Sequence, residues 1–162
     1  MRAVSHLSIA LLILFNVVCC YATDEVIPSD AKIVLKRGLC NGQCPSYTLT
    51  ILSDGKVIYE GEQYVRVVGR QETIVPTEKL AELIKNIEKI NFLDLAEQAK
   101  NPNCSYTTDM PSTEVLIALN GRVDSLKHGL KCYEEDFFRP FDDLAKSIDE
   151  AVDSQQWVMN KS

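Results

Sequence analysis

Two dipeptides limit the fold more than any other feature of the sequence. Asp54-Gly55 and Asn120-Gly121 each lie between two short runs rich in aliphatic, aromatic and threonine residues. These dipeptides favour tight hairpin turns because both central residues of such a turn need a positive φ angle, and the flanking residue types favour strands. The sequence therefore predicts two antiparallel hairpins. Their strands are expected at 47–52, 57–59, 115–119 and 122–128.

Two-residue turns raise a question about the faces of both hairpins. They would place polar and apolar side chains on each face, so either the loops are longer or both faces of the sheet are partly covered. Gly61 and Glu62 are expected to break one strand and Gly69 to interrupt another, because glycine within a strand weakens it or marks a bulge. Further strands are predicted at 32–37, 64–68 and 73–75.

In two later segments the apolar residues change to helical spacing. They recur three or four positions apart, as on the buried face of an amphipathic helix. The first set is Leu80, Leu83, Ile84 and Ile87, and the second is Phe141, Leu144, Ala145, Ile148 and Val152. Residues 92–107 are expected to be irregular, and Trp157 to pack back on the domain. The sequence thus predicts an α+β fold, a mainly antiparallel sheet with two amphipathic helices packed on it.

The first residues have the pattern of a secretory signal peptide. Residues 7–20 are almost wholly apolar, a run shorter than the roughly 20 residues of a membrane span. Cys20 and Ala22 suit cleavage before Thr23, and an uncleaved anchor is the alternative. The expected segments are a signal peptide at 1–22, a polar lead-in at 23–30 and a single globular domain at 31–158. We therefore predict a secreted, extracellular protein.

The mature chain is expected to be acidic. The sequence holds 17 basic and 23 acidic residues, and loss of the leader removes only Arg2, which changes the net charge from −6 to −7. A negative surface disfavours nucleic acid as a partner. No second long apolar run follows the leader, so no membrane association is expected after cleavage. The predicted partner is an unidentified extracellular protein or ligand, and no cofactor is predicted.

Four cysteines remain once the leader is removed, namely Cys40, Cys44, Cys104 and Cys132. An even number in a small secreted domain indicates disulfides. Four cysteines allow three pairings, and spacing alone does not choose between them. The short ring and the flexible Gly42 inside it favour a Cys40–Cys44 bond. A Cys104–Cys132 bond then follows by elimination.

Two other roles for these cysteines have to be weighed. Cys40 and Cys44, together with His128 and Cys132, are chemically suited to hold a structural zinc ion. An oxidising compartment argues against zinc, because free thiolates there tend to pair. A thioredoxin-like redox site usually has two residues between its cysteines, whereas three separate Cys40 from Cys44. No metal is therefore predicted.

Few residues suggest catalysis. The sequence contains no Gly-x-Ser-x-Gly, His-Glu-x-x-His or phosphate-binding glycine-rich motif. No catalytic residue is assigned, and Asp109, Lys127 and His128 are retained as a candidate functional patch. On a strand, Lys127 and His128 are expected to point to opposite faces. Asn103 and Asn160 match the acceptor pattern for N-linked glycosylation.

Two motifs resemble those of a known domain family. An R-G-x-C-x-G-x-C-P-x-Y motif begins at Arg37, and a D-G-x-V-x-Y-x-G motif begins at Asp54. With weaker motifs at 108–111 and 148–151, they resemble an uncharacterised family of exported or lipid-anchored bacterial domains over residues 31–158. The resemblance implies a compact mixed domain and export. It implies no activity, because that family is a domain of unknown function.

These observations predict a secreted, disulfide-stabilised binding or interaction module whose specificity the sequence does not define. Small size, secretion, cross-linking and the missing catalytic signature all favour this interpretation over an enzyme. The alternative is a small secreted hydrolase or redox enzyme that uses a polar site around Asp109, Lys127 and His128. Convergence of these three side chains in one concave pocket would support the enzyme.

Overall fold

The computed structural model describes residues 26–101, 105–106, 111–129, 133 and 135–159. The predicted signal peptide, residues 1–22, lies outside these ranges. The strands are β1 (Lys32–Arg37), β2 (Ser46–Leu52), β3 (Lys56–Gln63), β4 (Gly69–Ile74), β5 (Thr113–Leu119) and β6 (Arg122–Lys127). The helices are α1 (Thr77–Lys89), α2 (Phe92–Gln98), α3 (Glu135–Val152) and α4 (Gln155–Val158).

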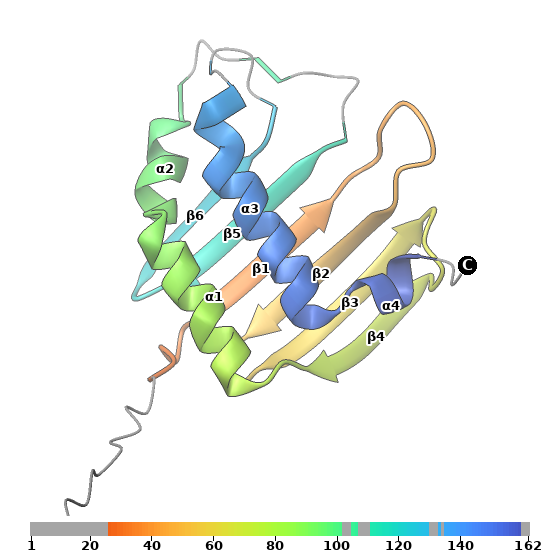
Figure 1. Ribbon diagram of the computed structural model, residues 1–162, viewed down its shortest axis with the longest axis horizontal. Coiled ribbons are helices and arrows are strands. Elements are labelled where there is room, and N and C mark those ends of the chain that lie inside the picture. The colour runs from red at the N-terminus through yellow and green to blue at the C-terminus, as the bar shows by residue number, and fades with distance from the viewer. Residues whose placement is uncertain (1–25, 102–104, 107–110, 130–132, 134, 160–162) are drawn as a thin grey trace, which may run out of the picture.

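All six strands form one sheet in the order β4-β3-β2-β1-β5-β6, and every neighbouring pair is antiparallel. The strand β1 therefore lies between the two predicted hairpins. Figure 1 shows all the labelled helices on one face of this sheet. The arrangement confirms the predicted α+β fold, with α2 and α4 added to the two helices that the apolar spacing indicated.

The first hairpin has a longer turn than its Asp-Gly dipeptide suggested. Ile51 pairs with Val57, which leaves a loop from Ser53 to Gly55 between the strands. Gly55 has a φ of 81°, the left-handed conformation that closes such a loop. The extra residue brings Ile51 and Val57 onto the same buried face. The longer loop therefore settles the question of faces for this hairpin.

The second hairpin keeps the two-residue turn. Leu119 pairs with Arg122, and Asn120 and Gly121 between them have φ angles of 53° and 76°. The Asp30 carboxylate accepts hydrogen bonds from both turn N–H groups, at 3.2 and 2.6 Å. These bonds, above all the one from Gly121, lower the pKa of Asp30. They also tie the lead-in segment to the turn.

The expected boundaries of β3 and β4 are wrong. Gly61 and Glu62 do not break β3, which continues to Gln63. Residues 64–68 form a loop rather than a strand, and β4 begins at Gly69 instead of being interrupted there.

Gly61 has a packing role rather than a strand-breaking one. A Cβ atom at this position would lie less than 3.0 Å from the carbonyl oxygen of Val67 and from the hydroxyl of Tyr59. Glycine is therefore the residue that lets the 64–68 loop fold back onto β3.

The helices α1 and α3 bury the apolar sets that the sequence predicted. In α1 these residues are Leu80, Leu83, Ile84 and Ile87, and in α3 they are Phe141, Leu144, Ala145, Ile148 and Val152. The helix α3 begins at Glu135, earlier than the apolar spacing indicated. Trp157 is buried as expected, and its ring stacks on that of Tyr59 with 4.8 Å between centroids.

The helix α2 occupies part of a segment that was expected to be irregular. It buries only Phe92 and Ala96, so its apolar pattern is too short to mark a helix. Asn91, immediately before it, has a φ of 52°, which separates α2 from α1. No helix within the described ranges is long and apolar enough to cross a membrane.

Candidate functional site

The sheet face opposite the helices carries an apolar band. Every second strand residue points to this face, which we call the open face because no described helix lies on it (Figure 1). Its large apolar side chains are Val34, Leu52, Ile58, Ile74, Leu116 and Val123. Ile74 is 75 % exposed and Val123 65 % exposed, at opposite edges of the sheet. A solvated face of an antiparallel sheet is usually polar, so this band needs an explanation.

Charged side chains surround the apolar band and partly interrupt it, because Lys32 is paired with Leu52 and Lys56 with Ile74. The basic ones are Lys32, Lys36, Lys56, Arg70 and Lys127, and the acidic ones are Glu60, Glu72 and Glu114. Five basic and three acidic residues give the open face a net charge of +2, whereas the whole chain carries −6. The open face is thus the basic side of an acidic protein, which favours an acidic partner there.

Glu72 on the edge strand β4 contacts two of these cations. Its carboxylate oxygens lie 2.6 Å from Arg70 Nη2 and 3.0 Å from Lys56 Nζ. Hydrogen bonds from Arg70 and then from Lys56 lower the pKa of Glu72. A hollow of about 700 Å³ runs along this edge, and its lining residues are Asp54, Lys56, Glu72, Thr73 and Ile74.

A polar network lies on the helix side, between the sheet and α3. Asp149 Oδ2 accepts hydrogen bonds from Arg37 Nη2 at 2.8 Å and Nε at 3.2 Å. Asp149 Oδ1 accepts hydrogen bonds from the Tyr47 and Ser154 hydroxyls, each at 2.7 Å. Arg37 Nη1 also donates to Thr113 Oγ1 at 2.8 Å. The network joins three neighbouring strands to the C-terminal half of α3.

The network is an internal anchor rather than an open binding site. Tyr47, Arg37 and Thr113 are lateral neighbours on β2, β1 and β5, so strand register alone brings them together. Both Asp149 oxygens already accept two hydrogen bonds, and all three guanidinium nitrogens of Arg37 donate. The side chains of Arg37 and Asp149 are only 26 % and 16 % exposed.

His128, immediately after β6, contacts the N-terminal half of α3 on the same side of the sheet. Its Nδ1 lies 2.6 Å from Asp142 Oδ1. Its ring stacks on Phe138 with 4.7 Å between centroids and meets Phe141 edge-on at 6.3 Å. A histidine beside a carboxylate is the geometry of many general bases. Among the residues that the structure describes, these contacts include no nucleophilic hydroxyl or thiol, so what they form is a histidine–carboxylate pair.

The candidate functional patch is not assembled by the residues that the structure describes. Lys127 points to the open face, with its Nζ 5.0 Å from the centroid of the Tyr106 ring. His128 points to α3, so the two side chains leave the strand end on opposite sides, as strand alternation predicts. Asp109 lies outside the described residues.

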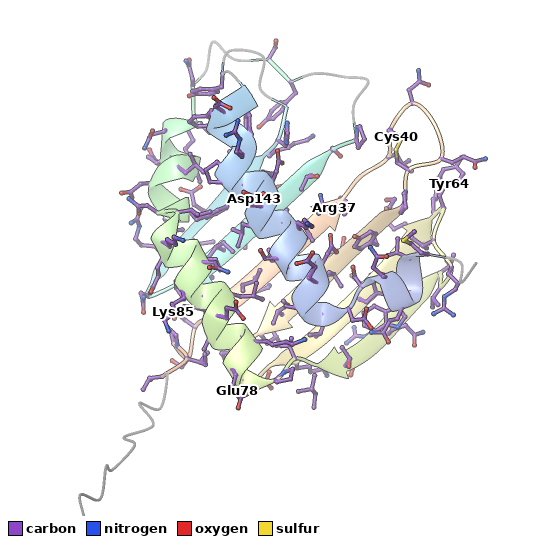
Figure 2. The ribbon with its side chains drawn as sticks, viewed as in Figure 1. Arg37, Cys40, Tyr64, Glu78, Lys85 and Asp143 are labelled. Carbon is purple, nitrogen blue, oxygen red and sulfur yellow. A yellow bond between two sulfur atoms is a disulfide. The ribbon has the colours of Figure 1, made fainter. Side chains whose placement is uncertain are left out.

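Cys40 and Cys44 form a disulfide in the loop between β1 and β2, with their Cα atoms 5.6 Å apart. Figure 2 places Cys40 at the same end of the sheet as Tyr64 in the β3–β4 loop. Because both sulfurs are bonded, neither is a thiolate ligand for zinc. Across the described ranges, no group of three or more His, Cys, Asp and Glu side chains is placed to hold a metal. Cys104, Cys132, Asn103 and Asn160 lie outside these ranges.

Replacing Cys40 and Cys44 together by serine is expected to lower the free energy of unfolding modestly. The cross-link closes a short ring, since the two cysteines are 4 apart in sequence. On the chain-entropy model such a ring contributes about 2 kcal/mol. Urea titration of wild type and double variant measures the difference, and a difference near zero would contradict the prediction.

Tyr47 is expected to resist ionisation at alkaline pH. Burial, followed by the negative charge of Asp149, raises the pKa of its hydroxyl well above the usual range. The folded state therefore holds this proton more tightly than the unfolded state does. Stability from this group is full below about pH 10, the usual tyrosine pKa, and falls as the pH rises above it.

An absorbance titration of tyrosinate tests this expectation. At about pH 11, where a free tyrosine is mostly ionised, wild type and Tyr47→Phe should give the same tyrosinate absorbance while both remain folded. The two curves should separate only when wild type unfolds. A separation of one full tyrosinate in the folded range would show that the Tyr47 hydroxyl is not protected.

The anchor has only a weak signature in the sequence. Arg37 and Tyr47 belong to the first motif, and Asp149 to the weak motif at 148–151. The signal in the sequence is that Arg37 and Tyr47 occupy strand positions on the same face as the buried residues of β1 and β2. A cation on a largely buried strand face favours a carboxylate partner, which the helix packed on that face can supply.

Comparison with known proteins gives one family. No curated protein matches the chain. The sequence model of Domain of unknown function (DUF6438) matches residues 31–152. That range begins one residue before β1 and ends at the last residue of α3, so it contains the whole sheet and the anchor residues Arg37, Tyr47 and Asp149. The chain therefore belongs to the family Domain of unknown function (DUF6438).

Proposed function

We propose that this chain is a secreted, disulfide-stabilised binding module that contacts an extracellular protein or ligand through its open face. The apolar band on that face is the observation that carries the proposal. Ile74 and Val123 are more than half exposed, and the remaining large apolar residues of the band are half-buried. Contiguous apolar surface with a polar rim marks sites of interaction on small soluble domains.

The centre of the band spans four neighbouring strands. Val34 on β1 is paired with Leu116 on β5, and Thr50 on β2 lies between Val34 and Ile58 on β3. Side chains in directly opposite positions lie about 5 Å apart, so these residues form one surface. Lys32 and Lys36 flank Val34 along β1. The partner expected from this chemistry presents apolar side chains bordered by carboxylates.

The N-terminal pattern and the cysteines support the extracellular part of the proposal. The leader has the apolar core and small-residue end of a signal peptide. The Cys40–Cys44 disulfide suits an oxidising compartment. The enzyme alternative receives less support, because Lys127 and His128 point to opposite sides of the strand end.

Capture experiments with a matched pair of variants test the open face. Immobilised protein 23–162 is incubated with the extracellular medium of its own source, and any captured species is purified and titrated against each variant. Leu116→Thr keeps a strand-forming residue but removes an apolar side chain from the open face. Met159→Thr removes an exposed apolar side chain elsewhere and is the control.

We expect Leu116→Thr to weaken binding about tenfold, the effect of losing roughly 1.4 kcal/mol of contact, and Met159→Thr to leave it unchanged. Equal binding by both variants, with thermal unfolding showing both folded, would exclude the open face as the binding surface.

Export is tested separately by N-terminal sequencing of protein recovered from the medium. The expected first residue is Thr23. Recovery only inside the cell, with Met1 retained, would contradict secretion while leaving the open-face proposal to be judged by the binding titration.

A further inference from the structure

The two edges of the sheet are protected to different degrees. An edge strand presents unpaired backbone N–H and C=O groups, and proteins usually cover or disrupt it. At the β6 edge, side chains of the α2 region reach over the strand: Lys100 Nζ lies 2.7 Å from Asp124 Oδ2, and Arg122 Nη2 lies 3.1 Å from Asp94 Oδ1.

The β4 edge has no such cover among the described residues. Five of the six residues of β4 are exposed and the sixth is half-buried. The strand contains neither proline nor lysine, the residues that most often block edge pairing. In Figure 1, β4 is the outermost strand, and α4 lies over the sheet face rather than beside the strand.

The sequence of β4 is complementary to itself in one antiparallel register. If Gln71 lies opposite Gln71 of a second copy, Arg70 of each chain lies opposite Glu72 of the other. Opposite charges in directly facing positions stabilise a strand pair. Within one chain Arg70 and Glu72 already lie 2.6 Å apart, so the paired strands would bring two cations and two anions into one alternating cluster.

The same register also covers exposed apolar side chains. If this register is extended by one residue before β4, to Val68, Ile74 of each chain lies opposite Val68 of the other. These residues are 75 % and 69 % exposed in the single chain. Burying them gives the pair a hydrophobic contribution at both ends, in addition to the two ion pairs and the backbone hydrogen bonds.

We propose that β4 pairs with β4 of a second copy of this chain, antiparallel and centred on Gln71. The two sheets then form one continuous sheet, and the two open faces lie side by side on the same surface. This interface uses only the β4 margin of the open face, at Arg70, Glu72 and Ile74. The centre of the band around Leu116 stays uncovered, so the pairing extends the proposed binding function without depending on it.

Charge reversal on β4 tests the interface, and the oligomeric state is measured by sedimentation equilibrium over a range of protein concentrations. Glu72→Arg places two arginines opposite each other at both ends of the register, and Arg70→Glu does the same with glutamates. Combining both substitutions in one chain restores opposite charges. Glu82→Arg, on the exposed side of α1, makes the same charge change away from β4.

Wild type is expected to be a dimer that dissociates on dilution. Each single substitution on β4 should raise the dimer dissociation constant about tenfold or more, whereas the double substitution and Glu82→Arg should leave it near the wild-type value. A wild type that is monomeric at every concentration, or a dimer equally stable in Glu72→Arg, would overturn the proposal.

A cysteine cross-link tests the register and does not depend on the charge variants folding. Directly opposite residues of an antiparallel pair have Cα atoms about 4.5–5.5 Å apart, within the range that a disulfide spans. Gln71→Cys should therefore form a covalent dimer under mild oxidation, and Glu82→Cys should not. Failure of Gln71→Cys to cross-link, or equal cross-linking of both variants, would contradict the register.

Discussion

Replacing Asp149 by alanine is expected to lower the free energy of unfolding by about 3 kcal/mol. The Asp149 carboxylate accepts two hydrogen bonds from Arg37 and one each from Tyr47 and Ser154. Its removal leaves a largely buried guanidinium without a counter-ion and two hydroxyls without an acceptor. Polar groups that lose their partners away from solvent account for the largest costs of single substitutions.

The neighbouring residue on the same helix provides the matched control. Glu150 is 66 % exposed on its side chain, and its carboxylate lies 3.6 Å from Lys146 Nζ. Exposed pairs of this kind contribute little, so Glu150→Ala should cost about 0.5 kcal/mol or less. Urea titrations with a common m value compare the two variants. A loss for Asp149→Ala no larger than that for Glu150→Ala would show that the anchor does not stabilise the fold.

A double-mutant cycle separates the ion pair from the hydroxyl contacts. If the pair with Arg37 dominates, Arg37→Ala and Asp149→Ala should cost less together than the sum of their separate effects, with a coupling of about 1–3 kcal/mol. Asp149→Asn keeps the size of the side chain and removes its charge. The free energy of unfolding of this variant should therefore lie between that of wild type and that of Asp149→Ala. These outcomes would identify the ion pair as the contact that holds α3 to the sheet.

Local chemistry was enough to predict β1, the two hairpins and the buried faces of the main helices. Asp54-Gly55 and Asn120-Gly121 marked the hairpins because a positive φ angle is demanding for most residues and easy for glycine. The spacing of Leu80, Leu83 and Ile87 predicted one face of α1, because helical period is a local property. Where the pattern was short, as in α2, this signal was too weak to identify a helix.

The local rule for glycine gives the wrong role for Gly61, because that role depends on a distant contact. Glycine within a strand usually weakens or breaks it. Here a backbone oxygen of the 64–68 loop lies where a Cβ atom would be, and that approach exists only once the loop has folded back. Propensity describes what a residue does to its own strand and contains no information about what packs against it.

The anchor and the open face also required tertiary structure. Arg37 and Asp149 are 112 residues apart, and no spacing rule connects them. The sequence partly indicated the open face, because the second hairpin has apolar residues such as Leu116 and Val123 on the face opposite its buried residues. The face that the helices cover depends on how the connections cross the sheet. The sequence alone therefore could not show that the apolar band stays uncovered.

Gly61→Ala is expected to lower the free energy of unfolding by about 3 kcal/mol, near the upper end of the usual cost of overpacking. The new methyl group would collide with the Val67 carbonyl oxygen and the Tyr59 hydroxyl. Neither can move freely, because the Tyr59 hydroxyl donates to that same oxygen at 3.0 Å. The Val67 N–H in turn donates to the Trp157 carbonyl at 2.9 Å. The collision is therefore transmitted to the C-terminal segment.

Gly42→Ala provides the control, since this glycine belongs to the first motif, as Gly61 belongs to the second, and lies in a loop. A Cβ atom there would meet only Cys40 Sγ, at 3.7 Å, which is an ordinary contact. Its cost should stay within about 0.5 kcal/mol, as for most surface substitutions.

Tryptophan fluorescence gives Gly61→Ala a second readout, because Trp157 is the single tryptophan of the chain and stacks on Tyr59. Displacement of the 64–68 loop should draw Trp157 away from Tyr59, expose it to water and shift its emission to longer wavelength in the folded protein. Gly42→Ala should leave the emission unchanged, because the disulfide loop does not include the Trp157 contacts. A Gly61→Ala protein with wild-type stability and wild-type emission would mean that the loop can rearrange without cost, and the packing role assigned to Gly61 would be wrong.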